Sequence, residues 1–97
     1  MYVVITRVQL LPGKIDTVRN LFEQTNPALV EGQADWIEAK FTANREKHQV
    51  TVLAYWKNAD SYERFRTGDE FHEVMSRFAP HFESPPEVTI TEVLFEM

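Results

Sequence analysis

The sequence predicts an α+β domain in which strands and helices follow one another in the order β-α-β-β-α-β. Three observations support this prediction. Four short segments are rich in β-branched and aromatic residues, two longer regions repeat apolar residues at helical spacing, and proline or glycine marks most boundaries between them. The 97 residues, 43% of them hydrophobic and 26% charged, have an ordinary globular composition, so we assign residues 1–97 to a single domain.

The first strand and the first helix occupy the N-terminal third of the chain. Residues 3–10 are β-rich and too few for a buried helix, and the Pro12-Gly13 turn ends the strand. Residues 14–31 carry apolar side chains three and four positions apart, which is typical of an amphipathic helix. Because Pro27 lacks a backbone donor, we expect it to kink or interrupt this helix.

The middle of the chain predicts an antiparallel hairpin. Residues 34–42 and 49–56 are two strand-like segments, and the second is the richer in β-branched and aromatic residues. Residues 44–47 between them are polar and few, which favours a tight connection.

The C-terminal third predicts two helices and a fourth strand. Asn58 is an N-cap candidate for a short helix. Thr67 and Glu70 match a capping box, which predicts that Thr67 caps a second helix. The apolar stripe of that helix consists of Phe71, Val74, Met75, Phe78 and Phe82. Pro85-Pro86 ends the helical region, and residues 88–95 form the last predicted strand.

This order is the split βαβ, or ferredoxin-like, arrangement with a four-stranded antiparallel sheet. Both helical layers then cover one face of the sheet and leave the other open. Successive strand residues point to opposite faces, yet both faces of the first and last strands are apolar. A solvated face would alternate with charged residues, so we expect a homodimer that pairs through the open sheet face. The alternative is a monomer whose open sheet face stays exposed and is only modestly apolar, because threonines contribute polar hydroxyl groups to it.

Composition and charge exclude several classes of function. The chain has no Cys, and its three His residues share no ligand spacing, so we expect no metal site. Its 15 acidic residues outnumber 10 basic ones, which do not cluster, so we expect no nucleic-acid partner. No apolar run approaches about 18 residues, so we expect no membrane span. The absence of a signal-peptide pattern after Met1 predicts a cytoplasmic protein.

Four segments carry a resemblance to a known family. The third strand ends in Trp56, and Lys57, the capping Asn58 and a short aromatic-bearing helix follow. The other three segments are Pro12-Gly13-Lys14, Thr67-Gly68-Asp69-Glu70-Phe71-His72 and Pro85-Pro86-Glu87-Val88. With these motifs the whole chain resembles the antibiotic biosynthesis monooxygenase family. The resemblance implies a dimeric α+β barrel of two ferredoxin-like subunits.

The resemblance also implies which chemistry to expect at which residue. In the haem-degrading branch an Asn, a Trp and a His act together, and their positions here hold Thr6, Phe65 and Met75. Haem degradation is therefore not expected. In the quinone-forming branch a Trp, an Asn four residues earlier and a Tyr six residues later act together. Those positions hold Trp56, Val52 and Tyr62, so two of the three are retained and the Asn is missing.

We therefore predict a cofactor-independent monooxygenase that acts on a small aromatic or polyphenolic molecule. Its candidate catalytic residues are Trp56, Tyr62 and His72, the last because a His can act as a base near neutral pH. Its candidate substrate-binding residues are Thr6, Phe65, Phe71, Met75 and Phe78. For each of these residues, packing in the core or on the surface is the alternative interpretation. Two other functions stay open: a non-enzymatic small-molecule-binding or stress-related dimer of the same fold, and an isomerase of small metabolites.

Overall fold

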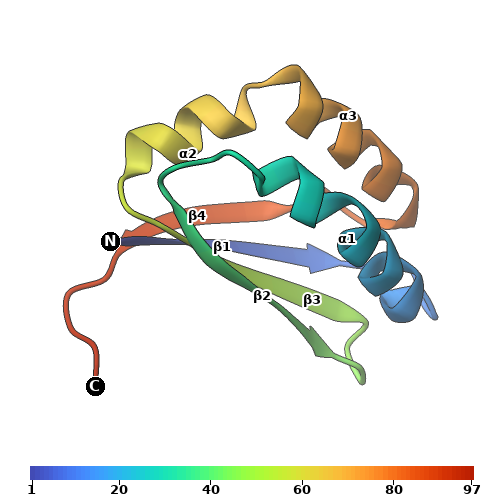
Figure 1. The fold of residues 1–97 in the computed structure, drawn as a ribbon. Helices are drawn as coiled ribbons and strands as arrows, with labels where there is room; N and C mark the ends of the chain where they lie inside the picture. Colours follow the sequence, from blue (N-terminus) through green and yellow to red (C-terminus); the bar gives the residue numbers. More distant parts are fainter.

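The computed structural model describes residues 1–97 and has a helical layer on one side of a four-stranded sheet (Figure 1). The strands are β1 (Tyr2–Gln9), β2 (Trp36–Asn44), β3 (Gln49–Trp56) and β4 (Glu87–Glu92). The helices are α1 (Ile15–Val30), α2 (Ala59–Arg66) and α3 (Asp69–Phe78), and a short 3-10 turn, η1 (Ala79–His81), follows α3. The sheet order is β2-β3-β1-β4, and every neighbouring pair is antiparallel. The predicted ferredoxin-like order is confirmed.

The expected break at Pro27 does not occur, because α1 runs through it without interruption. A proline inside a helix removes one hydrogen bond and costs about 3 kcal/mol. Burial of Leu29 beyond the proline offsets this cost, since its side chain is part of the main core. The Thr25 hydroxyl also donates to the Leu21 carbonyl at 2.8 Å, inside the same turn.

The expected capping box at Thr67 is wrong. Gly68 is the N-cap of α3 and provides no side-chain hydrogen bond. The Thr67 hydroxyl instead donates to the carbonyls of Glu63 and Arg64, at 3.1 and 3.0 Å. These carbonyls lie in the last turn of α2, where they have no partner within the helix. The hydroxyl therefore closes the preceding helix rather than opening the next one.

The last strand is shorter than the sequence predicts. β4 ends at Glu92 because its partner β1 begins at Tyr2, directly opposite. One further bond joins the Val93 N–H to the Met1 carbonyl at 2.9 Å. Leu94 and Phe95 have no strand left to pair with and are 86% and 80% exposed. The C-terminal tail leads away from the helices, past the open side of the sheet (Figure 1).

The core fills the space between the sheet and the helices. Its main cluster consists of Val8, Leu10, Ile15, Val18, Leu29, Val50, Val74 and Phe78. A second cluster of Val4, Trp56 and Tyr62 lies at the end of the sheet where β3 leads into α2. Apolar residues on the opposite side of β1, such as Val3 and Ile5, are only half-buried. The second cluster contains Trp56 and Tyr62, two of the three predicted catalytic residues.

Candidate functional site

Trp56 is the most deeply buried large side chain at the end of the sheet. It is 1% exposed and is the last residue of β3, opposite Tyr2 on β1 and Trp36 on β2. Its ring centroid lies 5.0 Å from that of Phe65 and 5.9 Å from that of Tyr62. The indole Nε1 is buried and has no hydrogen-bond partner. Since nearly all buried polar groups in native proteins are paired, this free donor requires an explanation.

Helix α2 holds Tyr62 and Phe65 against Trp56. Its N-cap is Asn58, whose side-chain oxygen accepts from the Ser61 N–H at 2.8 Å. Tyr62 follows Ser61 and is 6% exposed. Burial raises the pKa of the Tyr62 phenol, an effect that Arg66 opposes. The phenol is therefore neutral at physiological pH and can donate a hydrogen bond or a proton.

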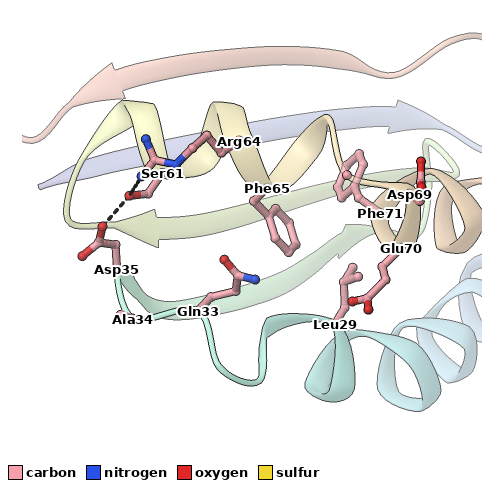
Figure 2. Close-up of a pocket in the computed structure, with 11 residues that line it drawn as sticks. Leu29, Gln33, Ala34, Asp35, Ser61, Arg64, Phe65, Asp69, Glu70 and Phe71 are labelled. Carbon is pink, nitrogen blue, oxygen red and sulfur yellow. Dashed lines mark hydrogen bonds between the residues drawn. The ribbon is translucent and has the colours of Figure 1, made fainter.

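A cavity of about 530 Å³ lies between the C-terminal end of α1, the loop that leads to β2, and the α2–α3 turn. It is lined by Leu29, Gln33, Ala34, Asp35, Ser61, Arg64, Phe65, Gly68, Asp69, Glu70 and Phe71. Figure 2 shows the Phe65 ring and the Gln33 amide pointing toward each other across it. The rings of Phe65 and Phe71 are 5.3 Å apart. This volume lies within the usual range for small-molecule sites, about 300–1,000 Å³.

A network of polar side chains lies at one end of the cavity. The Asp35 carboxylate accepts a hydrogen bond from the Ser61 hydroxyl (Figure 2). It also accepts one from the Asn58 amide, at 3.0 Å. The hydrogen bonds from Ser61 and then Asn58 lower the pKa of Asp35, so it stays ionised. Arg64 donates to the Ser61 hydroxyl oxygen at 3.1 Å. The network ties the residue just before β2 to the first turn of α2.

The structure brings only some of the predicted site residues together. Phe65 and Phe71 line the cavity, and Trp56 and Tyr62 lie directly behind Phe65. Thr6 is half-buried on β1. Three others also lie outside the cavity lining. Phe78 belongs to the main core, Met75 lines a separate hollow of about 460 Å³, and His72 is exposed with its ring 6.4 Å from Phe71.

The predicted substrate-binding residues are mostly aromatic or apolar, whereas charged and amide side chains form much of the cavity lining. Gln33, Asp35, Ser61 and Arg64 were not among the predicted site residues. The only local signal is the Asn58 cap, which places Ser61 in the first turn of α2. The partnership of Ser61 with Asp35, which lies 26 residues away, arises only when α2 packs beside the start of β2.

A comparison with known protein families identifies the family of this chain. Residues 1–77 match the family named antibiotic biosynthesis monooxygenase, which is well over half of the sequence. The chain belongs to the antibiotic biosynthesis monooxygenase family. No curated protein matches it. The matched residues run from the N-terminus through β1 to the last turn of α3.

Solved structures confirm the family fold at low sequence identity. A Bordetella bronchiseptica protein named after the family is 18% identical, with a TM-score of 0.85, and 97% of each chain is covered. A variant of SnoaB, a cofactor-independent oxygenase from Streptomyces nogalater, is 13% identical, with a TM-score of 0.82. That comparison covers 99% of this chain and 95% of SnoaB. A Nitrosomonas europaea protein, also named after the family, is 10% identical, with a TM-score of 0.82 over 98% and 100% of the chains.

Within the antibiotic biosynthesis monooxygenase fold, the residues at the positions matched to the haem-degrading and quinone-forming branches do not line a common cavity. Thr6 and Val52 are direct cross-strand partners on β1 and β3. Val52 is half-buried and packs against the main core. Met75 faces its separate hollow, and Phe65 faces the cavity.

No three His, Asp or Glu side chains come close enough together to hold a metal ion. None of the helices has the length and apolar character that crossing a membrane requires.

Proposed function

We propose that this protein is a cofactor-independent monooxygenase of a small, electron-rich aromatic molecule that carries hydroxyl groups. The observation that carries the proposal is the unpartnered Nε1 of Trp56, buried beside Tyr62 and Phe65. An unsatisfied buried donor costs about 1–3 kcal/mol. A substrate oxygen would satisfy it, so the indole is set to bind the substrate rather than to stabilise the free protein.

The proposed reaction requires no electrons beyond those of the substrate. An anthrone-like substrate loses a proton, and its carbanion gives one electron to dioxygen. The substrate radical and superoxide combine as a peroxide anion on the ring carbon, and this anion takes up a proton, which balances the one that the substrate lost. Loss of water from the resulting hydroperoxide leaves a carbonyl group. One oxygen atom thus enters the product and the other leaves as water, with the substrate as the only reductant. The protein contributes orientation, exclusion of water and hydrogen bonds.

Trp56 and Tyr62 have distinct roles in this proposal. The Trp56 N–H holds a carbonyl or phenolic oxygen of the substrate, and the neutral Tyr62 hydroxyl delivers a proton to the oxygen that departs. Phe65 stands between Trp56 and the cavity, so its ring must turn aside when the substrate enters. Rearrangements of one side chain on ligand binding are common. The exposed position of His72 gives it no part in this geometry.

Oxygen uptake tests the proposal. A panel of anthrones and dihydroxynaphthalenes is incubated with the protein in an oxygen electrode, with protein-free solution as the autoxidation control. We expect protein-dependent uptake of one dioxygen per product molecule, strongly reduced in Trp56→Phe. Trp36→Phe, which changes the other, only half-buried tryptophan, serves as the matched control. Rates equal to autoxidation for every compound would contradict the proposal.

A second candidate function is a non-enzymatic small-molecule-binding dimer. The observation that favours it is Val52, which replaces the family's Asn with a side chain that packs in the core and has no polar atom. In that case flat aromatics would bind in the cavity, would quench tryptophan fluorescence and would not raise oxygen uptake. The same panel therefore separates the two functions.

We also propose that the protein pairs through its open sheet face. Val3 and Ile5 on β1 lie directly opposite Tyr55 and Leu53 on β3, which makes a contiguous apolar patch. The C-terminal tail leads past the same side of the sheet (Figure 1). It carries Leu94, Phe95 and Met97, which are strongly exposed. A second copy that covers this face would remove from water both the apolar patch on β1 and β3 and the apolar side chains of the tail.

A further inference from the structure

Arg64 is a cation at the cavity that no carboxylate neutralises directly. Its only side-chain hydrogen bond goes to the Ser61 hydroxyl oxygen, at 3.1 Å. Four other arginines each have a carboxylate oxygen within 4.0 Å: Arg19 with Asp16 and Glu23, Arg45 with Asp16, Arg66 with Glu63, and Arg77 with Glu73. Among the residues that line the cavity, Arg64 is the one basic side chain.

The acidic residues of the cavity do not occupy the Arg64 guanidinium. Asp35 already accepts from Ser61 and Asn58. It makes no direct hydrogen bond or close ion pair with Arg64, although the charge of Arg64 contributes to lowering the pKa of Asp35. Asp69 and Glu70 are in the first turn of α3, where the helix dipole stabilises negative charge. Figure 2 shows these two at the opposite end of the cavity from Arg64, with Phe65 between them. The cavity thus has one end that holds Arg64 and Asp35, an aromatic middle, and an acidic end with no basic side chain.

We infer that Arg64 is a specificity-determining residue that binds a singly charged oxygen anion, a phenolate or a carboxylate, on an aromatic ligand stacked against Phe65. The inference rests on the proposed use of this cavity as the ligand site. The guanidinium has several donors and uses one of them on Ser61, so the others are free for an oxygen anion. Three carboxylates against one guanidinium make the cavity lining acidic, so a doubly charged group such as a phosphate monoester is disfavoured.

The role of the Asp35–Ser61 pair in this inference is to hold the guanidinium in place. Ser61 is buried, and its hydroxyl donates to Asp35 while it accepts from Arg64. The ionised Asp35 therefore orients the Ser61 hydroxyl so that its lone pairs face Arg64. An arginine that is held in one orientation loses less side-chain entropy when it binds an anion.

Binding of three naphthalene compounds by calorimetry tests the inference. The probes are 2-naphthoate, its neutral analogue 2-naphthamide, and the dianion 2-naphthyl phosphate. We expect the wild type to prefer 2-naphthoate over both others by about two- to fivefold at low salt, a preference that 0.5 M salt reduces, because the cation is exposed. In Arg64→Gln the preference for naphthoate over naphthamide disappears, and in Arg64→Lys part of it returns.

Arg66→Gln is the matched control, because Arg66 lies on the same helix, pairs with Glu63 and does not line the cavity. It should keep the wild-type preference. Thermal unfolding of each variant shows whether α2 is still in place. A wild type that binds none of the probes, or that binds 2-naphthamide as well as 2-naphthoate, overturns the inference, and so does an Arg64→Gln variant that keeps the preference.

The proposed function fails independently of this inference. If naphthoate binds in an Arg64-dependent way and no phenol or anthrone gives oxygen uptake, the recognition role of Arg64 stands and the monooxygenase activity does not. If oxygen uptake occurs but Arg64→Gln discriminates between the probes as the wild type does, the activity stands and the recognition role is overturned.

Discussion

Replacement of Trp56 by Phe tests whether the indole ring only packs in the core or also binds the substrate. The change removes about three heavy atoms from a side chain that is 1% exposed. At about 0.8 kcal/mol for each buried methylene-sized group, the smaller ring lowers the free energy of unfolding by about 2–3 kcal/mol. The change also removes an unpartnered buried N–H, which returns about 1–3 kcal/mol. We therefore expect the variant to lose no more than about 2 kcal/mol of stability.

Ligand binding should respond much more strongly than stability does. In the wild type the ligand gives the indole N–H its missing acceptor, whereas the phenyl ring of the variant has no donor. The affinity for an aromatic ligand, or its turnover, should fall by about 1–3 kcal/mol, which is roughly 5-fold to 150-fold. Urea unfolding without ligand measures the first quantity, and calorimetric titration of a validated aromatic ligand measures the second.

Trp36→Phe provides the comparison for both measurements. Trp36 is half-buried at the start of β2 and packs on the same cluster, and it stays as the single tryptophan when Trp56 is replaced. A loss of more than about 4 kcal/mol in Trp56→Phe would mean that the indole N–H is satisfied in solution, for instance by a buried water. Equal ligand affinity in Trp56→Phe and the wild type would show that the indole only packs. Either result would refute the reasoning.

Three further perturbations test other parts of the structure. Burial raises the pKa of Tyr62, so folding favours its neutral form; the free energy of unfolding should fall as the pH rises above about 10, and Tyr62→Phe should lack this part of the decline in pH-dependent urea unfolding. The Leu94→Ser/Phe95→Ser double variant should shift the mass from about twice 11.4 kDa toward 11.4 kDa in sedimentation equilibrium, and a wild type that is already monomeric would contradict the dimer. Val52→Asn places an amide opposite Thr6 at a cost of about 1–2 kcal/mol in stability and should raise oxygen uptake; an unchanged rate would show that the missing Asn does not limit the chemistry.

The order of the elements could be predicted from the sequence because each depends on local patterns. The β-rich segment before Pro12 forms a strand, and the helical spacing after it forms a helix. Errors arose where a distant contact decides the local outcome. Pro27 lies inside α1 because Leu29 beyond it is held in the core, and the strand that begins near Val88 ends early because β1 has no further residues to pair with. Neither contact is visible in a window of neighbouring residues.

The lining of the cavity was predictable only where aromatic side chains contribute to it. Phe65 and Phe71 were expected to line a pocket, and they line the cavity. Met75 and Phe78 share the stripe of α3 with Phe71, but one stripe can face several surroundings along its length. The polar end at Arg64 carries no sequence signal, because an exposed arginine on a helix usually pairs with a neighbouring acid. Its lack of a direct carboxylate partner becomes evident only from the packing of α2.

Helix α2 holds the cavity in place through contacts at two of its turns. At its start, Asn58 both caps the helix and donates to Asp35, which fixes the helix against the strand that follows α1. One turn later, Tyr62 and Phe65 rest on Trp56. The polar anchor and the aromatic cluster therefore fix the cavity through the backbone of α2, without help from position 52. Val52 on β3 does not line the cavity, so the residue at that position can differ between proteins of this fold without moving the cavity. Similarity of fold therefore says less about the reaction than the residues that face the ligand do.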